Sequence, residues 1–229
     1  MKKNTIIILV FILLFAFTIN YSYIDSYLKS VFVQEESAFV EKVIDGDTIK
    51  INGTSVRLLG INCPEKGEEY YLEAKQYLES LILNKTVVLK YGNEKYDKYN
   101  RVLAYVFLEN ENINLKIVKE GYANYYFPSG KDKYYDDFVS VWQECLEINE
   151  NLCEKSENIC VDCVDLFYNN EEASLINSCS FECNFSEWKI KGEGRKIYYF
   201  DDSKADVGKQ DTLFLRDNEN RLVLWKILE

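Results

Sequence analysis

Apolar and polar positions alternate along the chain from residue 38 onward, and glycine-containing turns interrupt the alternation. The segments FVEKVIDGDTIKING (39–53) and TSVRLLGI (54–61) follow this period of two, with an Asp-Gly and an Asn-Gly dipeptide between the alternating runs. Alternation of this kind predicts half-buried strands, and these dipeptides are the ones that tight hairpin turns favour. The same pattern predicts two later strands, at residues 86–91 and 102–108.

Three other segments show helical spacing instead. Between Glu68 and Leu83, apolar side chains recur every three or four residues, as on one face of a helix. Two further amphipathic helices are predicted over Ile113–Glu120 and Asp132–Ile148, and Gly121 is placed to end the first of these. The predicted order is three strands, a helix, two strands and two helices.

The pattern changes after the polar stretch from Asn149 to Asn158, where we place a domain boundary. Short strand-like runs follow, separated by turn residues, and they predict a small all-β sandwich. The predicted strands cover residues 161–168, 173–177, 188–191, 196–200, 212–216 and 222–228.

The N-terminus begins with Met1-Lys2-Lys3 and continues with an apolar run from Thr5 to about Ile19. A positive start before a short apolar run is the layout of a secretory signal. The run is shorter than the ~20 residues that cross a bilayer comfortably. We expect residues 1–23 to be a signal anchor, or alternatively a cleaved signal peptide, and 24–37 to be a short stalk.

This organisation predicts an extracytoplasmic protein, either anchored to the membrane by its N-terminal helix or secreted. The exported portion would comprise one domain at residues 38–156 and a second at residues 157–229.

Composition narrows the available chemistry. The chain has 229 residues and no histidine, which excludes His-based triads, His proton shuttles and His-ligated zinc. Its formal net charge is −11, and an acidic protein has no long-range attraction for nucleic acid. A polyanionic substrate would therefore have to be held locally, by a few arginines and a bound cation.

Seven cysteines fit export to an oxidising space. Four of them, in a C-x2-C and a C-x3-C pair, have the look of a zinc ribbon, and the alternative, which export favours, is disulfides. With disulfides, Cys145 and Cys153 would form a further pair and leave Cys63 free. The four residues of the zinc-or-disulfide group are Cys160, Cys163, Cys179 and Cys183.

Three short motifs carry the candidate chemistry, in the order IDGDT (44–48), VRLLGINCPE (56–65) and DKYNR (97–101). The first supplies Asp45 and Asp47, and calcium accepts oxygen ligands of this kind in irregular geometry. Asp47 can ligate the ion directly while Asp45 holds a metal-bound water.

The other two motifs supply groups for the phosphate and for a proton. Arg57 and Arg101 each offer a guanidinium fork, which grips two phosphate oxygens and stays charged at any working pH. Glu65, after a proline that restricts the backbone, can orient or deprotonate an attacking water. These groups are the minimum for metal-assisted cleavage of a phosphodiester.

In order and spacing these motifs resemble the thermonuclease (staphylococcal nuclease-like) family, over roughly residues 38–156. The resemblance implies an α+β fold, an OB-type five-stranded β-barrel with three helices. It also implies an enzyme, a calcium-dependent phosphodiesterase that hydrolyses DNA and/or RNA to 3′-phosphate products. Carried over by position, it implies Asp47 as a Ca2+ ligand, Glu65 as general base, Arg57 and Arg101 as catalytic phosphate-binding residues, and Tyr99 near the substrate.

Three positions depart from the family pattern. A second calcium-ligating aspartate is expected where this chain has Asn62, and the amide removes one negative charge, so we predict weaker calcium affinity. The next residue, whose backbone carbonyl ligates the metal, is Cys63, and a backbone ligand survives that change. Asn100 replaces the glycine of DKYGR and tolerates a left-handed backbone.

The C-terminal segment from Ala173 to Phe200 resembles the lamin-tail domain, which has an immunoglobulin-like sandwich. The resemblance implies a binding or tethering module whose target the sequence does not identify. It rests on the spacing of Asn177, Cys179, Trp188, Ile190 and Phe200.

Three functional hypotheses follow from these observations, and one of them, a disulfide-stapled surface protein with no role in nucleic-acid chemistry, is opposed by the intact set of Asp47, Arg57, Glu65 and Arg101. The first is an exported calcium-dependent nuclease with an accessory sandwich. The alternative is a catalytically impaired OB-fold protein at the cell surface, which binds nucleic acid or another ligand without turnover, as Asn62 and the acidic charge favour.

Overall fold

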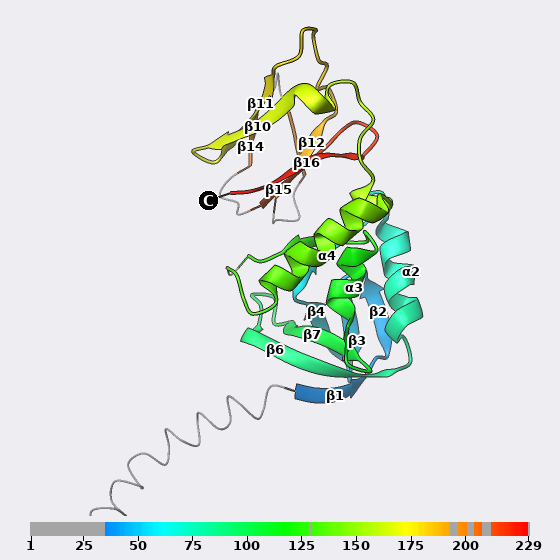
Figure 1. The fold of residues 1–229 in the computed structure, drawn as a ribbon. Helices are drawn as coiled ribbons and strands as arrows, with labels where there is room; N and C mark the ends of the chain where they lie inside the picture. The colour runs from blue at the N-terminus through cyan, green and yellow to red at the C-terminus, as the bar shows by residue number, and fades with distance from the viewer. Residues whose placement is uncertain (1–34, 129, 193–196, 201–203, 208–211, 229) are drawn as a thin grey trace, which may run out of the picture.

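The computed structural model describes residues 35–128, 130–192, 197–200, 204–207 and 212–228. They fold into two parts that pack against each other, an α+β part followed by a smaller all-β part (Figure 1). The predicted signal or anchor segment lies outside the described residues. Within the described ranges, no helix is both long enough and apolar enough to cross a membrane.

The first part is built on a mixed sheet with the order β1-β6-β7-β4-β3-β2, and β8 pairs with β7. All of its strand pairs are antiparallel except β4 and β7, which run parallel. A separate antiparallel pair is formed by β5 and β9. The strands are β1 (Glu35–Phe39), β2 (Lys42–Asp45), β3 (Thr48–Ile51), β4 (Thr54–Leu58), β5 (Gly60–Asn62), β6 (Thr86–Tyr96), β7 (Val102–Leu108), β8 (Glu111–Asn112) and β9 (Asn124–Tyr126).

The closed five-stranded barrel implied by the resemblance is not seen in the pairing of the described strands. The strand order is open, with β1 and β2 at its two ends. The chain leaves the main sheet at Gly60, which has a φ of 74° and allows β5 to pair with β9 instead. A side chain at Gly60 would collide with Phe138, because a Cβ there would lie 2.6 Å from its ring. β1 also begins at Glu35, inside the segment predicted as a stalk.

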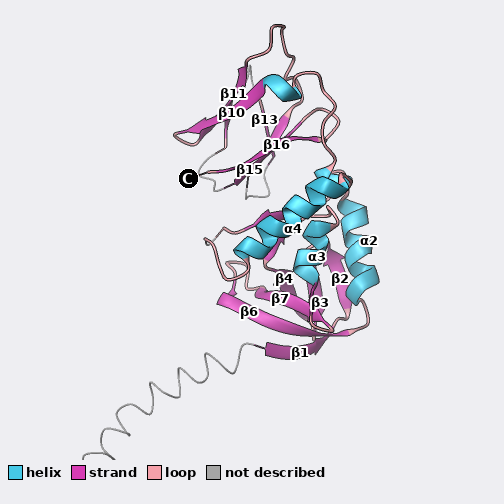
Figure 2. Ribbon diagram, in the orientation of Figure 1, coloured by secondary structure: helices cyan, strands magenta, loops and turns pink. Residues whose placement is uncertain are grey.

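Three helices cover the sheet of the first part, as predicted (Figure 2). They are α2 (Tyr71–Ile82), α3 (Ile113–Lys119) and α4 (Tyr135–Ile148). α2 begins three residues later than expected because Glu68 is held in a turn, where its amide donates a hydrogen bond to the Glu65 carbonyl at 2.8 Å. Gly121, with a φ of 72°, follows the end of α3, as the sequence predicted.

The second part consists of two small antiparallel sheets, and its all-β character matches the sequence-based expectation. One sheet has the order β10-β11-β14 and the other the order β13-β12-β15-β16. β14 was not among the predicted strands. The strands are β10 (Val164–Asn169), β11 (Glu172–Asn177), β12 (Lys189–Lys191), β13 (Ile197–Tyr199), β14 (Lys204–Asp206), β15 (Thr212–Arg216) and β16 (Leu222–Ile227).

The two parts share a hydrophobic core. Phe214 of β15 is fully buried, and its ring lies 5.1 Å from the ring of Trp142 in α4 and 5.5 Å from that of Tyr125 in β9. Edge-on aromatic contacts of this kind add to the free energy gained by burying the rings. The all-β part is therefore fixed against α4 and β9, beside the loop that follows β5.

Three disulfides reinforce the chain. Cys145–Cys153 ties the end of α4 to the short helix η1 (Asn151–Cys153) and leaves Cys63 free, as predicted for the disulfide alternative. The Cys63 side chain is buried. The four cysteines left open between zinc and disulfides are joined as disulfides here. These bonds are Cys160–Cys183 and Cys163–Cys179, beside the short helix η2 (Val161–Cys163). Several disulfides indicate an extracytoplasmic protein.

Truncating Phe214 tests the shared core. We expect Phe214→Ala to lower the free energy of unfolding by about 3–5 kcal/mol, because it removes a buried ring from between the two parts. Phe167→Ala is the matched control, since Phe167 lies in the same all-β part and is 50% exposed. Urea unfolding followed by tryptophan fluorescence measures both, and equal effects of the two substitutions would contradict a shared core.

Candidate active site

A buried ion pair between Asp47 and Arg57 forms the centre of the site. The guanidinium Nη2 of Arg57 lies 3.0 Å from Oδ2 of Asp47, and both side chains are almost completely buried. Arg57 also donates to the carbonyls of Leu58 and Ile61, each at 2.8 Å. Arg57 is thus not a solvated surface arginine, because its guanidinium holds the ends of β4 and β5 to Asp47.

The Asp47 carboxylate connects the first two sequence motifs. Its Oδ2 accepts a hydrogen bond from the backbone amide of Cys63 at 3.1 Å, and its Oδ1 accepts one from the hydroxyl of Thr48 at 3.0 Å. The turn between β2 and β3 is therefore bonded directly to the loop that follows β5. Asn62, the second predicted metal ligand, is adjacent to this contact and is buried.

Close packing beneath the turn explains its glycine. A Cβ on Gly46 would lie 2.8 Å from the Cys63 sulfur and 2.9 Å from the Cβ of Ala74 in α2. The turn can approach the helix this closely only without a side chain at this position. Burial, and then the charge of Asp47, raise the pKa of the Cys63 thiol well above its usual value. Cys63 is therefore a neutral packing residue.

The donor set suits a hard cation. Burial and the neighbouring charge of Asp47 raise the pKa of Asp45, as expected when two carboxylates share a small space. The carboxylates of Asp45 and Asp47, the side-chain oxygen of Asn62 and the backbone carbonyl of Cys63 can all serve as oxygen ligands, which calcium prefers. Asp45 is more exposed than Asp47, in keeping with the outer position predicted for it.

Glu65 lies in a turn that the second part of the molecule contacts. Its backbone amide donates to Oε2 of Glu68 at 3.0 Å, and the same oxygen accepts from the Lys191 amino group of β12 at 2.7 Å. Glu68 thus joins the loop of the candidate general base to the all-β part. Sequence patterns could not indicate this contact, because 123 residues separate its two side chains.

Arg101 belongs to a separate turn between β6 and β7. Its Nε donates to Oδ2 of Asp97 at 2.7 Å, and the backbone amides of Tyr99 and Arg101 donate to Oδ1 of the same carboxylate at 2.9 Å each. Asn100 adopts a φ of 61°, the left-handed conformation expected for this position. Tyr99 is 67% exposed, and the Arg101 guanidinium lies 5.5 Å from its ring centroid.

The structure brings most of the predicted residues together. Hydrogen bonds and an ion pair join Asp45, Asp47, Arg57 and Cys63, and Asn62 and Glu65 flank Cys63 on the same loop. Parallel pairing of β4 with β7 sets Val56 level with Val102, so the Arg101 turn lies beside the start of β4, which leads to Arg57. Within the described part of the chain, no hydrogen bond or ion pair joins Arg101 to the Asp47–Arg57 pair.

Comparison with known proteins identifies the family. Residues 55–152 match the family described as staphylococcal nuclease homologue. The thermonuclease of Staphylococcus intermedius is 40% identical over 116 residues, which are 46% of this chain and 69% of that protein. The chain belongs to the staphylococcal nuclease family.

Two further proteins are similar to this chain at somewhat lower identity. Uncharacterized protein MJ1439 of Methanocaldococcus jannaschii is 36% identical over 151 residues, covering 52% of this chain and 72% of that protein. Endonuclease YhcR of Bacillus subtilis is 32% identical over 124 residues, covering 45% of this chain and 10% of that protein. The family match ends at residue 152, before the first strand of the all-β part.

The Asp97 turn makes a pH-dependent contribution to stability. Burial opposes ionisation of Asp97, but its hydrogen bonds from Arg101 and Tyr99 outweigh burial and lower its pKa. We expect Asp97→Asn to reduce the free energy of unfolding at pH 7 by about 1–2 kcal/mol. The difference should persist above the unfolded pKa of about 3.9 and vanish as the pH falls through the lower folded pKa.

Urea titrations of both proteins between pH 7 and pH 2 measure this difference. Asp162→Asn is the matched control, because Asp162 is exposed in the all-β part. A stability difference for Asp97→Asn that widens toward low pH would contradict the interpretation.

Proposed function

We propose that this protein is an exported, calcium-dependent nuclease that hydrolyses phosphodiester bonds of DNA and/or RNA to 3′-phosphate products. The observation that carries the proposal is the bonding of Asp47, which contacts Arg57 and the backbone of the Asn62–Glu65 loop at once. Membership of a nuclease family supports it, because nucleic acid is then the expected substrate.

Calcium would be held by Asp47, Asn62 and the Cys63 carbonyl, with Asp45 in the outer shell. When bound, the ion supplies charge stabilisation for the phosphate and lowers the pKa of a bound water. The protein's own share is to orient that water through Glu65 and to keep Asp47 in place through Arg57.

The two arginines would share the phosphate unequally. The Arg101 side chain is 21% exposed and that of Arg57 only 6%. Arg101 uses Nε and Nη2 on Asp97, and the side chain of the neighbouring Tyr99 is exposed. We therefore assign the main phosphate contact to Arg101 and assign Arg57 chiefly to fixing Asp47, with stabilisation of transition-state charge in both cases.

The function is tested with Glu65→Gln. We expect the purified protein to degrade single- or double-stranded DNA or RNA in millimolar calcium, and chelation to abolish the activity. Glu65→Gln should lower kcat by about 10²–10⁴-fold, since it removes the group that orients and deprotonates water.

Glu73→Gln is the matched control, because Glu73 is an exposed glutamate on α2. Product ends are read by labelling with and without phosphatase. A folded wild-type protein that shows no cleavage of any of these substrates at any calcium level would overturn the proposal.

One observation favours a second candidate function, a catalytically impaired protein that binds nucleic acid or another ligand. Asn62 is buried at a predicted metal-ligand position, where an amide contributes less negative charge than a carboxylate. Calcium or nucleotide binding without hydrolysis would select this alternative.

Asn62→Asp tests the role of the amide. We expect calcium affinity to rise by about tenfold, because a third carboxylate joins Asp45 and Asp47 around the ion. Without calcium the variant should be less stable than the wild type, since three like charges then share a buried space. Isothermal titration and calcium-dependent melting measure both effects, and unchanged calcium affinity would show that Asn62 does not ligate the ion.

For the all-β part we propose a lamin-tail-like binding or tethering module, supported by the small antiparallel sheets and by buried Trp188. Attachment to the membrane through the N-terminal segment is likewise a proposal, and it rests on the sequence alone.

A further inference from the structure

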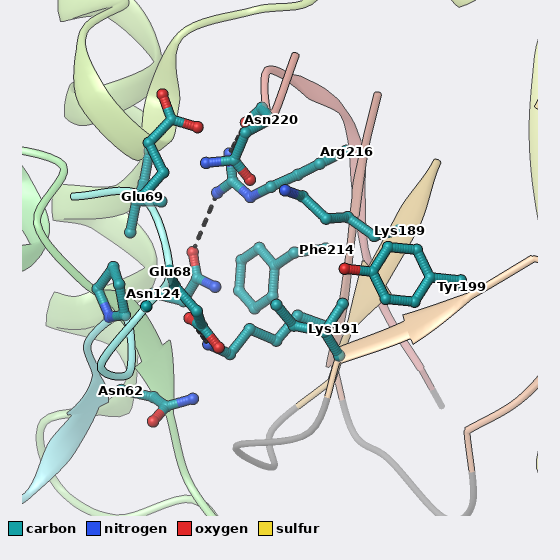
Figure 3. A pocket seen from close by; sticks show the side chains of 14 residues that line it. Asn62, Glu68, Glu69, Asn124, Lys189, Lys191, Tyr199, Phe214, Arg216 and Asn220 are labelled. Carbon is teal, nitrogen blue, oxygen red and sulfur yellow. Dashed lines mark hydrogen bonds and ion pairs between the residues drawn. The ribbon is translucent and has the colours of Figure 1, made fainter. Parts of the chain in front are cut away.

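A cavity of about 170 Å³ lies between the two parts of the molecule, beside the candidate active site (Figure 3). On one side it is lined by Asn62 and Pro64, from the loop that carries the candidate metal site and Glu65. On the other side it is lined by three basic side chains of the all-β part, Lys189, Lys191 and Arg216. At ~30 Å³ per water, its volume equals several waters and is sufficient for a phosphate group.

The basic side chains share one face of the sheet β13-β12-β15. Lys189 pairs directly with Arg216 on one neighbouring strand and with Tyr199 on the other. Lys191 is two residues from Lys189, so it points to the same face. Like charges directly opposite each other destabilise a sheet. The repulsion between Lys189 and Arg216 therefore has to be offset by negative charge nearby.

Arg216 is the most constrained of these groups. It is 4% exposed, and it donates hydrogen bonds to the Asn220 carbonyl at 3.1 Å and to Oδ1 of Asn124 at 3.3 Å. Among the described residues, no carboxylate forms an ion pair with it. Burial lowers the pKa of Arg216 to about 10, and nearby acidic groups offset this only in part. A buried charge without a counter-ion is costly, and an anion in the cavity would remove that cost.

The charges of the cavity are only partly balanced by the protein. Lys191 forms an ion pair with Glu68 at 2.7 Å, and Glu69 also lines the cavity. Burial, and then the charge of Arg216, lower the pKa of Lys189, so an added anion would favour its charged form. Tyr199 is 63% exposed at the edge of the cavity, with its hydroxyl directed inward.

We propose that this cavity is a second phosphate site, which binds a backbone phosphate of the nucleic-acid strand next to the one at the catalytic centre. Arginine and lysine donors suit a phosphate, and the site shares a wall with the candidate metal site through Asn62. In a chain of net charge −11, a local group of cations is needed to hold a polyanion. That the bound strand is nucleic acid rests on the proposed function. The phosphate site itself does not require that the protein cleave the strand.

The first test is binding by the full chain, with a chelator present so that no cleavage occurs. The probe is a fluorescein-labelled single-stranded 12-nucleotide DNA, followed by anisotropy at several salt concentrations. We expect Lys189→Gln to weaken binding by about tenfold and to reduce the salt slope by about 0.7, the value for one phosphate contact on a single strand. Lys189 is chosen because it forms no ion pair with the described residues and is less buried than Arg216.

Lys204→Gln is the matched control. It lies in the same part on β14, is paired with Glu172, and has a side chain that is 64% exposed. It should leave both the affinity and the salt slope unchanged. Equal effects of the two substitutions, or none from Lys189→Gln, would overturn the proposal, as would a wild-type protein that does not bind the oligonucleotide. The proposal would also be overturned if the protein bound inorganic phosphate but Lys189→Gln left its affinity for the oligonucleotide unchanged.

The second test separates this site from the catalytic one. With calcium, Lys189→Gln should raise KM for the 12-nucleotide DNA and leave kcat unchanged, while a dinucleotide too short to span both sites should show no change in KM. An equal rise for both substrates would mean that Lys189 acts through the catalytic loop, and the phosphate site would be wrong. Binding that depends on Lys189 without any cleavage would instead refute the proposed nuclease activity and leave this site standing.

Discussion

The buried ion pair between Asp47 and Arg57 is the contact on which the candidate active site depends. Two charges taken out of water are tolerated only when each is paired and further hydrogen-bonded. Here Arg57 also bonds the carbonyls of Leu58 and Ile61, and Asp47 bonds the amide of Cys63. The pair therefore holds the β2–β3 turn, the end of β4 and the loop that follows β5 as one unit. Loss of either charge would leave the other buried without compensation, so the same contact supports the fold and fixes the geometry of the candidate site.

The all-β part packs against this unit and is bonded to it. Phe214 enters the core of the nuclease part, and Lys191 contacts Glu68, which accepts a hydrogen bond from the amide of Glu65. The nuclease part alone presents mainly acidic and amide groups at this edge, whereas β12 and β15 bring cations to it. A small second domain can in this way change the electrostatics of an active site without altering any catalytic residue.

The sequence predicted local elements well, but it predicted contacts between residues far apart in the sequence poorly. Strand β7 and the three helices were predictable because their apolar spacing is regular over seven or more residues. Motif order alone was sufficient to propose Asp47, Arg57 and Glu65 as candidate site residues. It was not sufficient to show that Arg57 is buried, because that depends on β5 turning away at Gly60 to pair with β9. Nor did spacing indicate that Lys189 and Arg216 lie opposite each other, since strand register between segments so far apart is set by the folded structure.

The packing of Cys63 beneath Gly46 has a consequence for how the protein survives outside the cytoplasm. Six cysteines are already paired, and the seventh has no route to an oxidant or to another chain while the β2–β3 turn rests against α2. Only a molecule whose nuclease part has opened exposes this thiol. The exposed thiol of one unfolded chain can then attack a disulfide of another and release one of its cysteines as a thiol. Disulfide-linked dimers on a non-reducing gel would therefore reveal that unfolding has occurred.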